Sequence, residues 1–373
     1  MRAHTNNIGL LRLLFASLVI IGHAPEMIDG NRSREPLTML FHSVSLGELS
    51  VDAFFLLSGY LITKSMVRGG SLPHYFERRI LRIYPAFVVA FAVCAFGLGT
   101  LLRVYPWQAP AQMVIRFIAL SAPPIPPNFS GTIPVPSLNG AMWSIGYEFR
   151  CYLIVALLWK LGLLKRRGAI LGLTLAGLVL SIARTFPAGE ALLGKLDHFG
   201  PFSPISGYAS LSVRMYTIFA VGMCFYLYRA ELDRLLNAPV AIACTLVAVV
   251  LLFFPHVAEA GLVTFGAVLL FWLGLRANLG PAQKINDSWD ISYGTYLYGW
   301  PVATAILWYY PGITPWLLAA VALPLALVAG AISWWGLERY AKDVRIFEAR
   351  PRPLDSIPPP AQAAQHRSGG SIP

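Results

Sequence analysis

The sequence predicts an all-α protein, a polytopic transmembrane helical bundle, and three observations lead to that prediction. Of its 373 residues, 56% are hydrophobic and 13% are charged, and the mean hydropathy is +0.60. These values lie outside the range of soluble domains. Apolar runs of about 18 or more residues recur along almost the whole chain, and a helix needs roughly 20 residues to cross the hydrocarbon core. The net charge of +11 comes from basic residues that cluster at the ends of these runs. This distribution indicates membrane topology, and we expect no nucleic-acid partner.

The apolar runs predict about ten membrane-spanning helices. They cover residues 8–28, 49–67, 83–102, 141–160, 168–186, 211–228, 238–255, 258–275, 291–310 and 314–336. The first run is not a cleavable signal peptide, because Arg12 and His23 lie inside it and no small-residue cleavage site follows. If the N-terminus lies in the cytoplasm, most basic connections lie there too. The positive-inside rule therefore predicts that both termini are cytoplasmic.

The connections on the outer side are expected to be irregular. They are residues 29–47, 103–140 and 187–210. The stretch from Pro123 to Pro136 is too rich in proline to form a helix, and it could fold over the outer mouth of the bundle. The apolar stretch 111–120 is too short to span a bilayer and predicts an interfacial or re-entrant helix.

The chain is expected to form one membrane domain, residues 1–345, followed by a disordered cytoplasmic tail, residues 346–373. The tail is rich in Pro, Ala, Gln, Ser and Gly, a composition that cannot build a packed core. The four cysteines lie within apolar runs and lack the paired spacing of a zinc site or a disulfide framework. We therefore expect no metal ion.

Two ionisable residues in the first span are candidates for function, since such side chains are costly in a bilayer and usually face a cavity. Arg12 and His23 are eleven residues apart. At about 100° per residue this is within roughly 20° of three full turns, so both lie on one helix face, about 16 Å apart. Arg12 lies in the cytoplasmic half of the span, and His23 lies near its outer third. A histidine that only hydrogen-bonds a neighbouring helix is the alternative interpretation.

Two carboxylates are candidate site residues. Asp52 lies close to the outer interface, and Glu148 lies about 10 Å below the outer end of its span, at a depth comparable to that of His23. A carboxylate beside a histidine fixes the imidazole tautomer and stabilises the imidazolium, so the pair predicts a general base. Asp52 could instead cap the second span. A structural pair of Glu148 with Arg150 is disfavoured, since residues two apart do not face each other on a helix.

Two arginines are candidates for phosphate binding. Arg79 and Arg82 are three residues apart, so they share a helix face at the cytoplasmic interface. Guanidinium groups bind phosphate through paired hydrogen bonds. Their role as ordinary basic anchors at a membrane surface remains the alternative.

Taken together, these residues resemble the membrane acyltransferase-3 family, which O-acylates bacterial polysaccharides, lipopolysaccharides, Nod factors and some macrolides. Five segments match in order: Arg12 to His23 with ten residues between them, Val51–Leu61, Arg79-x-x-Arg82 before Ile83-Tyr84-Pro85, Trp143–Glu148 and Ser292–Tyr298. The stretch Glu148–Tyr152 is similar to the exopolysaccharide-modifying branch.

The resemblance implies an O-acyltransferase of the bacterial cytoplasmic (inner) membrane. The donor is expected to be acyl-CoA, with acetyl as the acyl group, and the acceptor a hydroxyl of a cell-surface or exported saccharide. The resemblance implies His23 as the essential base. From its depth we expect Glu148 to orient His23, and Asp52 could position the hydroxyl. Arg79 and Arg82 are implied as contacts of the coenzyme A phosphates, and Arg12 as a second positive point deeper in the cavity.

One position departs from the family. Many members have a histidine after the Ser-Tyr-Gly motif where this chain has Gly299, so any role of that histidine is absent. Alternative functions are a transporter or flippase of a lipid-linked saccharide, whose buried charges would form a translocation path, and a non-catalytic scaffold. Among acyltransferases, a macrolide or other small-molecule O-acyltransferase and a succinyltransferase also remain open.

Overall fold

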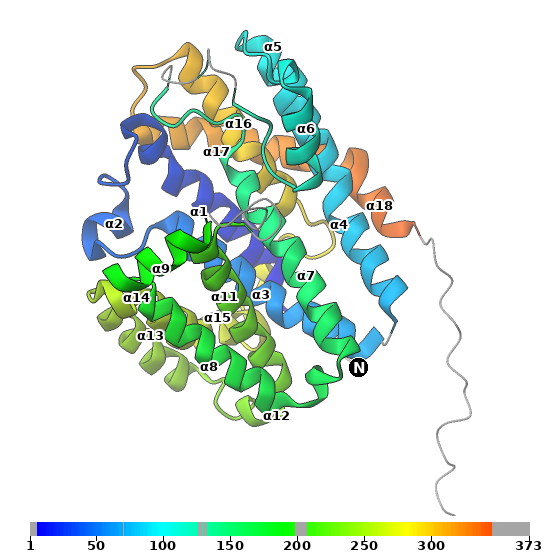
Figure 1. The fold of residues 1–373 in the computed structure, drawn as a ribbon, viewed down its shortest axis with the longest axis vertical. Coiled ribbons are helices and arrows are strands. Elements are labelled where there is room, and N and C mark those ends of the chain that lie inside the picture. Colours follow the sequence, from blue (N-terminus) through cyan, green and yellow to red (C-terminus); the bar gives the residue numbers. More distant parts are fainter. Residues whose placement is uncertain (1–5, 70, 126–128, 130–132, 198–206, 345–373) are drawn as a thin grey trace, which may run out of the picture.

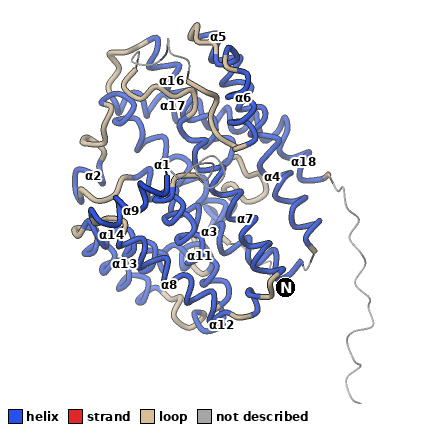
Figure 2. The backbone as a smooth tube through the Cα atoms, in the orientation of Figure 1, coloured by secondary structure: helices blue, strands red, loops and turns tan. Residues whose placement is uncertain are grey.

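The protein is all-α in the residues that its computed structural model describes, which are 6–69, 71–125, 129, 133–197 and 207–344. These residues form helices and connecting segments and contain no β-strand (Figure 1, Figure 2). The predicted fold class is therefore confirmed for them. The expected disordered tail, residues 346–373, lies outside the described residues.

Each of the ten predicted spans contains helix. The helices are α1 (Ile8–Asp29), α3 (Leu46–Gly69), α4 (Leu72–Ala92), α5 (Gly99–Leu101), α7 (Trp143–Lys160), α8 (Arg167–Ala183), α11 (Ala209–Leu227), α13 (Ala238–Leu252), α14 (Pro255–Gly261), α15 (Ala267–Leu275), α16 (Ser292–Tyr309), α17 (Pro315–Ser333) and α18 (Arg339–Asp343). Single π-helical segments join α4 to α5, α14 to α15 and α17 to α18. These three sets are continuous helices, because the π-turns change only the local winding.

Within the part of the chain that the structure describes, seven helices are long and apolar enough to cross a membrane. An eighth would be α8 together with α9 (Pro187–Asp197), which are bent by 105° relative to each other. The other two predicted spans correspond to α13, which has 15 residues, and to α16. The length and composition of the helices thus establish a multi-pass membrane protein with seven or eight candidate spans.

Helix α3 lies inside the bundle and packs closely against α11. A Cβ atom added at Gly59 would lie 2.1 Å from the carbonyl oxygen of Phe219, and one added at Gly222 would lie 2.1 Å from that of Leu56. The two backbones approach each other where neither helix has a side chain, as is common between membrane helices. Figure 1 shows α4, α7 and α18 on one side of the bundle and α8, α13 and α14 on the other.

The connections expected on the outer side are partly described. The helix predicted near residues 111–120 is present as α6 (Pro110–Ile118), and its apolar residues Val114, Ile115 and Ile118 are exposed. Within the proline-rich stretch, residues 121–125 and 133–136 are irregular, as predicted, and residues 126–128 and 130–132 lie outside the described residues. Short helices α2 (Pro36–Phe41) and α12 (Arg229–Leu232) lie in other connections.

Candidate active site

A cavity of about 660 Å³ lies among α1, α3, α4, α7, α16 and α18. One end, the arginine end, is lined by Arg78, Arg79 and Arg82 of α4. The other, the far end, is lined by Val51 of α3, Ser144 of α7 and Tyr296 of α16. Of the six residues predicted for the site, Arg12, Arg79, Arg82 and Glu148 line this cavity, and His23 and Asp52 are not part of its lining.

Arg12 and Arg82 both bind the carboxylate of Asp290, which the sequence analysis missed. The Nη1 atom of Arg12 donates to Oδ2 of Asp290 at 2.5 Å, and Nη2 of Arg82 donates to the same oxygen at 2.8 Å. Asp290 directly precedes α16, so one carboxylate joins α1, α4 and the start of α16. A signal was present in the sequence, because Asp290 stands two residues before the Ser292-Tyr293-Gly294 motif.

The other carboxylate oxygen of Asp290 is also occupied. Oδ1 accepts hydrogen bonds from Nδ2 of Asn286 at 3.2 Å and from the backbone N–H of Ser292 at 3.2 Å, and from the Ser292 hydroxyl. Although burial favours the neutral acid, the charges of Arg12 and Arg82 lower the pKa of Asp290 well below its usual range. Asp290 is thus an ionised carboxylate between two cations.

Arg79 has more unused hydrogen-bonding capacity than Arg82. Its Nη2 donates to the hydroxyl of Ser65 at 3.3 Å, and its guanidinium lies over the rings of Tyr75 and Tyr152 at 5.9 and 5.8 Å. Its buried Nε–H has no partner among the described residues. A buried donor without a partner is costly, so an anionic ligand at the arginine end would find a free hydrogen-bond donor there.

Glu148 lies in the cavity and does not bond His23, which corrects the predicted pairing. Its Oε1 accepts from the hydroxyls of Ser58 at 3.1 Å and Tyr152 at 2.6 Å. Equal depth along two helices did not bring the side chains together, because depth leaves open the direction in which each helix face points.

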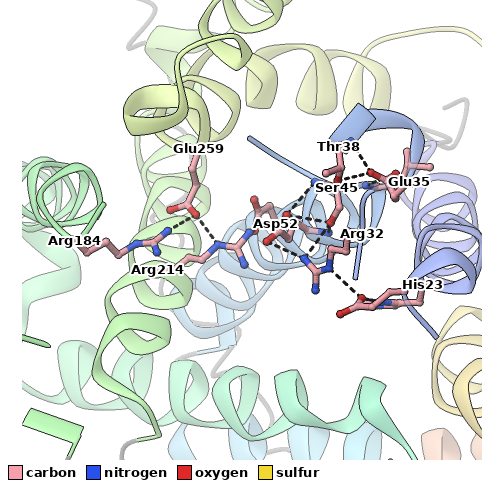
Figure 3. Close-up of polar contacts among 12 residues, drawn as sticks. His23, Arg32, Glu35, Thr38, Ser45, Asp52, Arg184, Arg214 and Glu259 are labelled. Carbon is pink, nitrogen blue, oxygen red and sulfur yellow. Dashed lines mark hydrogen bonds and ion pairs between the residues drawn. The ribbon is translucent and has the colours of Figure 1, made fainter. Parts of the chain in front are cut away.

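His23 instead bonds Glu26, a residue of its own helix. Its Nδ1 lies 2.8 Å from Oε2 of Glu26, and the same oxygen accepts from Nε of Arg32 at 3.0 Å (Figure 3). The ring of Trp300 packs edge-on against the imidazole with the ring centres 5.2 Å apart. The sequence analysis missed Glu26, although residues three apart face each other on a helix and this spacing could have identified it.

Two helices place His23 beyond the far end of the cavity. Trp300, which contacts His23, is one turn further along α16 than Tyr296. Gly47, which also lies against the imidazole, is one turn before Val51 on α3. One helical turn is about 5.4 Å. The rings of Phe54 and Tyr296 both line the cavity, and their centres are 5.9 Å apart.

Asp52 belongs to a buried ion cluster. Its Oδ1 accepts from Arg214 of α11 at 2.7 Å, and Arg214 also donates to Glu259 of α14 at 2.6 Å (Figure 3). Glu259 also binds Arg184, at 2.5 Å. The cluster joins α3, α11 and α14. Arg214 was detectable as an ionisable residue inside a predicted span.

Asp52 does not cap α3. That helix begins at Leu46, and the cap is formed by Ser45 and Glu48. The backbone N–H of Glu48 donates to the Ser45 hydroxyl at 3.2 Å, and the backbone N–H of Ser45 donates to Oε2 of Glu48 at 2.9 Å. This reciprocal pattern is a capping box, which the sequence Ser-x-x-Glu encodes.

The glycine at position 299 packs against α1. A Cβ atom added at Gly299 would lie 2.5 Å from Cγ1 of Ile20. A side chain at this position would therefore require that of Ile20 to shift.

Comparison with known proteins places the chain among acyltransferases. The acyltransferase-3 family model, described as an acyltransferase domain, matches residues 5–335. The chain is 24% identical over 332 residues to an O-acetyl transferase of Shigella phage Sf6, covering 87% of this chain and 92% of the relative. It is 27% identical over 370 residues to nodulation protein 10 of Rhizobium leguminosarum bv. viciae, covering 92% and 94%. It is 28% identical over 131 residues to acyltransferase MdmB of Streptomyces mycarofaciens, covering 33% and 31%. No solved structure matches the chain.

Proposed function

The chain belongs to the acyltransferase-3 family of membrane O-acyltransferases, and from this premise we propose that it transfers an acetyl group from acetyl-CoA to a saccharide hydroxyl. The family resemblance drawn from the sequence motifs is confirmed, and the protein is a multi-pass membrane acyltransferase. The donor, the acceptor and the residues that act on them are the subject of the proposal. The observation that carries it is a cavity with arginines at one end and a histidine–carboxylate pair one turn beyond the other end.

The proposed topology follows from the basic residues. We propose ten crossings of a bacterial cytoplasmic membrane, with both termini in the cytoplasm, because the basic connections then lie on the cytoplasmic side. The arginine end of the cavity faces the cytoplasm in this arrangement, and His23 lies toward the outer face. Acyl-CoA is a cytoplasmic metabolite, so the donor would enter at the arginine end, and an exported saccharide would arrive at the opposite one.

The donor site is proposed to lie in the cavity, whose residues suit coenzyme A. The free Nε–H of Arg79 offers a hydrogen bond to a phosphate, and Arg78 adds positive charge beside it. Arg82 and Arg12 are partly neutralised by Asp290, so they contribute positive potential along the cavity. Glu148, Ser58 and Ser144 are polar groups further in, and they suit the amide groups of the pantetheine arm.

The reaction proposed at His23 is a direct acyl transfer. Nε2 of His23 takes the proton of the acceptor hydroxyl as its oxygen attacks the thioester carbonyl carbon. The tetrahedral intermediate then collapses, the carbon–sulfur bond breaks, and the imidazolium returns the proton to the departing coenzyme A thiolate. General-base catalysis of this kind contributes about 10²- to 10⁴-fold. Asp52 is proposed to have a structural role, because its bonds go to Arg214.

The test uses purified protein, labelled acetyl-CoA and a saccharide acceptor. His23→Ala is expected to reduce transfer by at least about 10²-fold, whereas the thermal shift caused by acetyl-CoA is retained. Transfer by His23→Ala at the wild-type rate would refute the proposal.

The same preparation separates the enzyme from a flippase of a lipid-linked saccharide. A flippase needs no thioester donor, so it predicts no stabilisation by acetyl-CoA. The enzyme predicts stabilisation that is lost when Arg79→Ala and Arg82→Ala are combined.

A further inference from the structure

We infer that Glu26 is the carboxylate that positions His23 for acyl transfer, a role that comparable depth in the membrane had predicted for Glu148. The inference rests on the proposed function, in which His23 is the base. Glu26 touches neither donor nor acceptor in this scheme, so it is a positioning residue that acts through the imidazole.

The bond between the two side chains fixes the imidazole tautomer. Glu26 lies three residues after His23 in the last turns of α1, and its Oε2 is 2.8 Å from Nδ1 of His23. A carboxylate can only accept, so Nδ1 carries the hydrogen. Nε2 is then the unprotonated nitrogen and has the lone pair that a base needs.

Gly47 of α3 faces the Nε2 edge of the imidazole. A Cβ atom added at Gly47 would lie 3.3 Å from both Nε2 and Cε1 of His23, so a larger residue at this position would crowd the basic nitrogen. Trp300 contacts the ring at an interplanar angle of 67°. The imidazole is thus restrained by a carboxylate at Nδ1 and an indole at its side, and a residue without a side chain faces Nε2.

Glu26 is itself held by a charged neighbour. Arg32 donates to Oε2 of Glu26 at 3.0 Å, to Glu48 at 3.0 Å and to the Ser45 hydroxyl at 3.3 Å (Figure 3). Glu48 and Ser45 form the cap of α3. Arg32 therefore connects the end of α1 to the start of α3 and keeps an ionised carboxylate in place beside His23.

The charged groups facing His23 are few. Its own helix contributes Glu26, the segment after α1 contributes Arg32, and α3 contributes Glu48 through Arg32. Helix α16 contributes the uncharged Trp300. The side chains of His23 and Glu26 are 15% and 19% exposed, so solvent screens the pair less than it would on an open surface.

General-base catalysis by His23 needs a carboxylate beside the imidazole. When His23 takes the acceptor proton it becomes an imidazolium, and an adjacent carboxylate stabilises that charge until the thiolate receives the proton. Glu148 is unsuited to this task because it is bonded to Ser58 and Tyr152 inside the cavity.

The experiment replaces Glu26 by glutamine and measures kcat and KM for acetyl-CoA between pH 5 and 9. Glu26→Gln is expected to lower kcat by about 10- to 10³-fold with KM changed less than about twofold. Glu26→Asp, which keeps the charge, should recover part of the activity.

The matched control is Asp29→Asn. Asp29 lies at the end of the same helix, and its carboxylate binds Arg34 rather than His23. The same change of acid to amide should leave kcat and the pH profile unchanged. Thermal unfolding of each variant in detergent shows whether it is folded. If Glu26→Gln is not folded, the kcat of Glu26→Asp tests the inference instead.

Two outcomes overturn the inference. One is a Glu26→Gln enzyme with wild-type kcat and pH profile. The other is a Glu148→Gln enzyme that shows the kcat loss at unchanged KM expected for Glu26→Gln. In both cases an inactive His23→Ala enzyme would leave the proposed function standing, so the two failures are distinguishable.

Discussion

At the scale of single residues, Asp290 holds two arginines of the cavity in place and partly balances their charge. It neutralises Arg12 and Arg82 and also accepts three hydrogen bonds at the start of α16. Removing one partner of such a buried pair leaves uncompensated charge, which costs about 3–5 kcal/mol. Asp290 therefore affects both folding and the electrostatics of the cavity.

We predict that Asp290→Asn lowers the thermal unfolding temperature at pH 7 and that the difference from wild type becomes smaller as the pH falls below about 4. The folded-state pKa of Asp290 is depressed, so its stabilisation is fully present above the unfolded-state pKa of about 4. The stabilisation is lost as the pH falls toward the folded value. Thermal unfolding of both proteins in detergent between pH 3 and 8 checks this. A difference that is constant over the whole range would contradict it.

Arg79 and Arg82 are predicted to have different roles, in donor binding and in stability respectively, although they are three residues apart on one helix face. Arg79→Met should raise KM for acetyl-CoA by about 10-fold or more, since a charge-assisted hydrogen bond is worth about 1.5–3 kcal/mol, with little change in kcat. Arg82→Met should chiefly lower stability, because Arg82 binds Asp290. Initial rates and thermal unfolding measure the two effects. Lys160→Met, an exposed basic residue at the end of α7, is the control and should alter neither.

At the scale of elements, the close contact between α3 and α11 positions both the cavity and the outer ion cluster. Helix α3 contributes Val51, Phe54 and Ser58 to the cavity and Asp52 to the cluster. Gly59 and Gly222 allow the two helices to approach. The spacing of these helices therefore sets the geometry of the site without any contact to the reacting atoms.

We predict that Gly59→Ala and Gly222→Ala each destabilise the protein by about 1–3 kcal/mol, because the added methyl group would press on a carbonyl oxygen of the neighbouring helix. Gly172→Ala on α8 is the matched control, since a Cβ atom there would meet nothing within 4 Å. Thermal unfolding in detergent distinguishes them. Equal unfolding temperatures for Gly59→Ala and Gly172→Ala would refute the packing argument.

At the scale of the whole molecule, the cavity and the His23–Glu26 pair lie along one path through the bundle. The arginine end opens at α4 and α18, and His23 lies one turn past the far end. With the proposed topology, donor and acceptor approach from opposite faces of the membrane. Transfer then needs the acyl group to pass from the far end of the cavity, lined by Val51 and Tyr296, to His23 one turn beyond.

We predict that the donor acts from one side only. Inverted membrane vesicles from cells that make the protein should transfer label from acetyl-CoA, because their cytoplasmic face is outside, whereas right-side-out vesicles should not. Scintillation counting of the saccharide fraction measures this, and detergent-opened vesicles are the control for enzyme content. Equal labelling in both orientations of sealed vesicles would contradict the proposed topology.

The sequence by itself determined the fold class and the segments that become helix. Hydropathy and the length needed to cross a bilayer act along the chain, so a linear pattern records them. The capping box of Ser45 and Glu48 and the pairing of His23 with Glu26 are also local, because helical spacing alone brings such residues together. The motifs carried the family resemblance for the same reason, since their order and spacing can be compared directly.

Only the tertiary structure decided which ionisable groups meet across helices. Glu148 and His23 share a depth but do not bond, Asp52 binds Arg214, and Asp290 joins Arg12 to Arg82. Depth in the membrane follows from residue number, whereas the direction of a side chain follows from the rotation of each helix about its axis. That rotation is set by packing between residues far apart in the chain, such as Gly59 against Phe219. For this reason the sequence could name most of the charged residues of the site but not their partners.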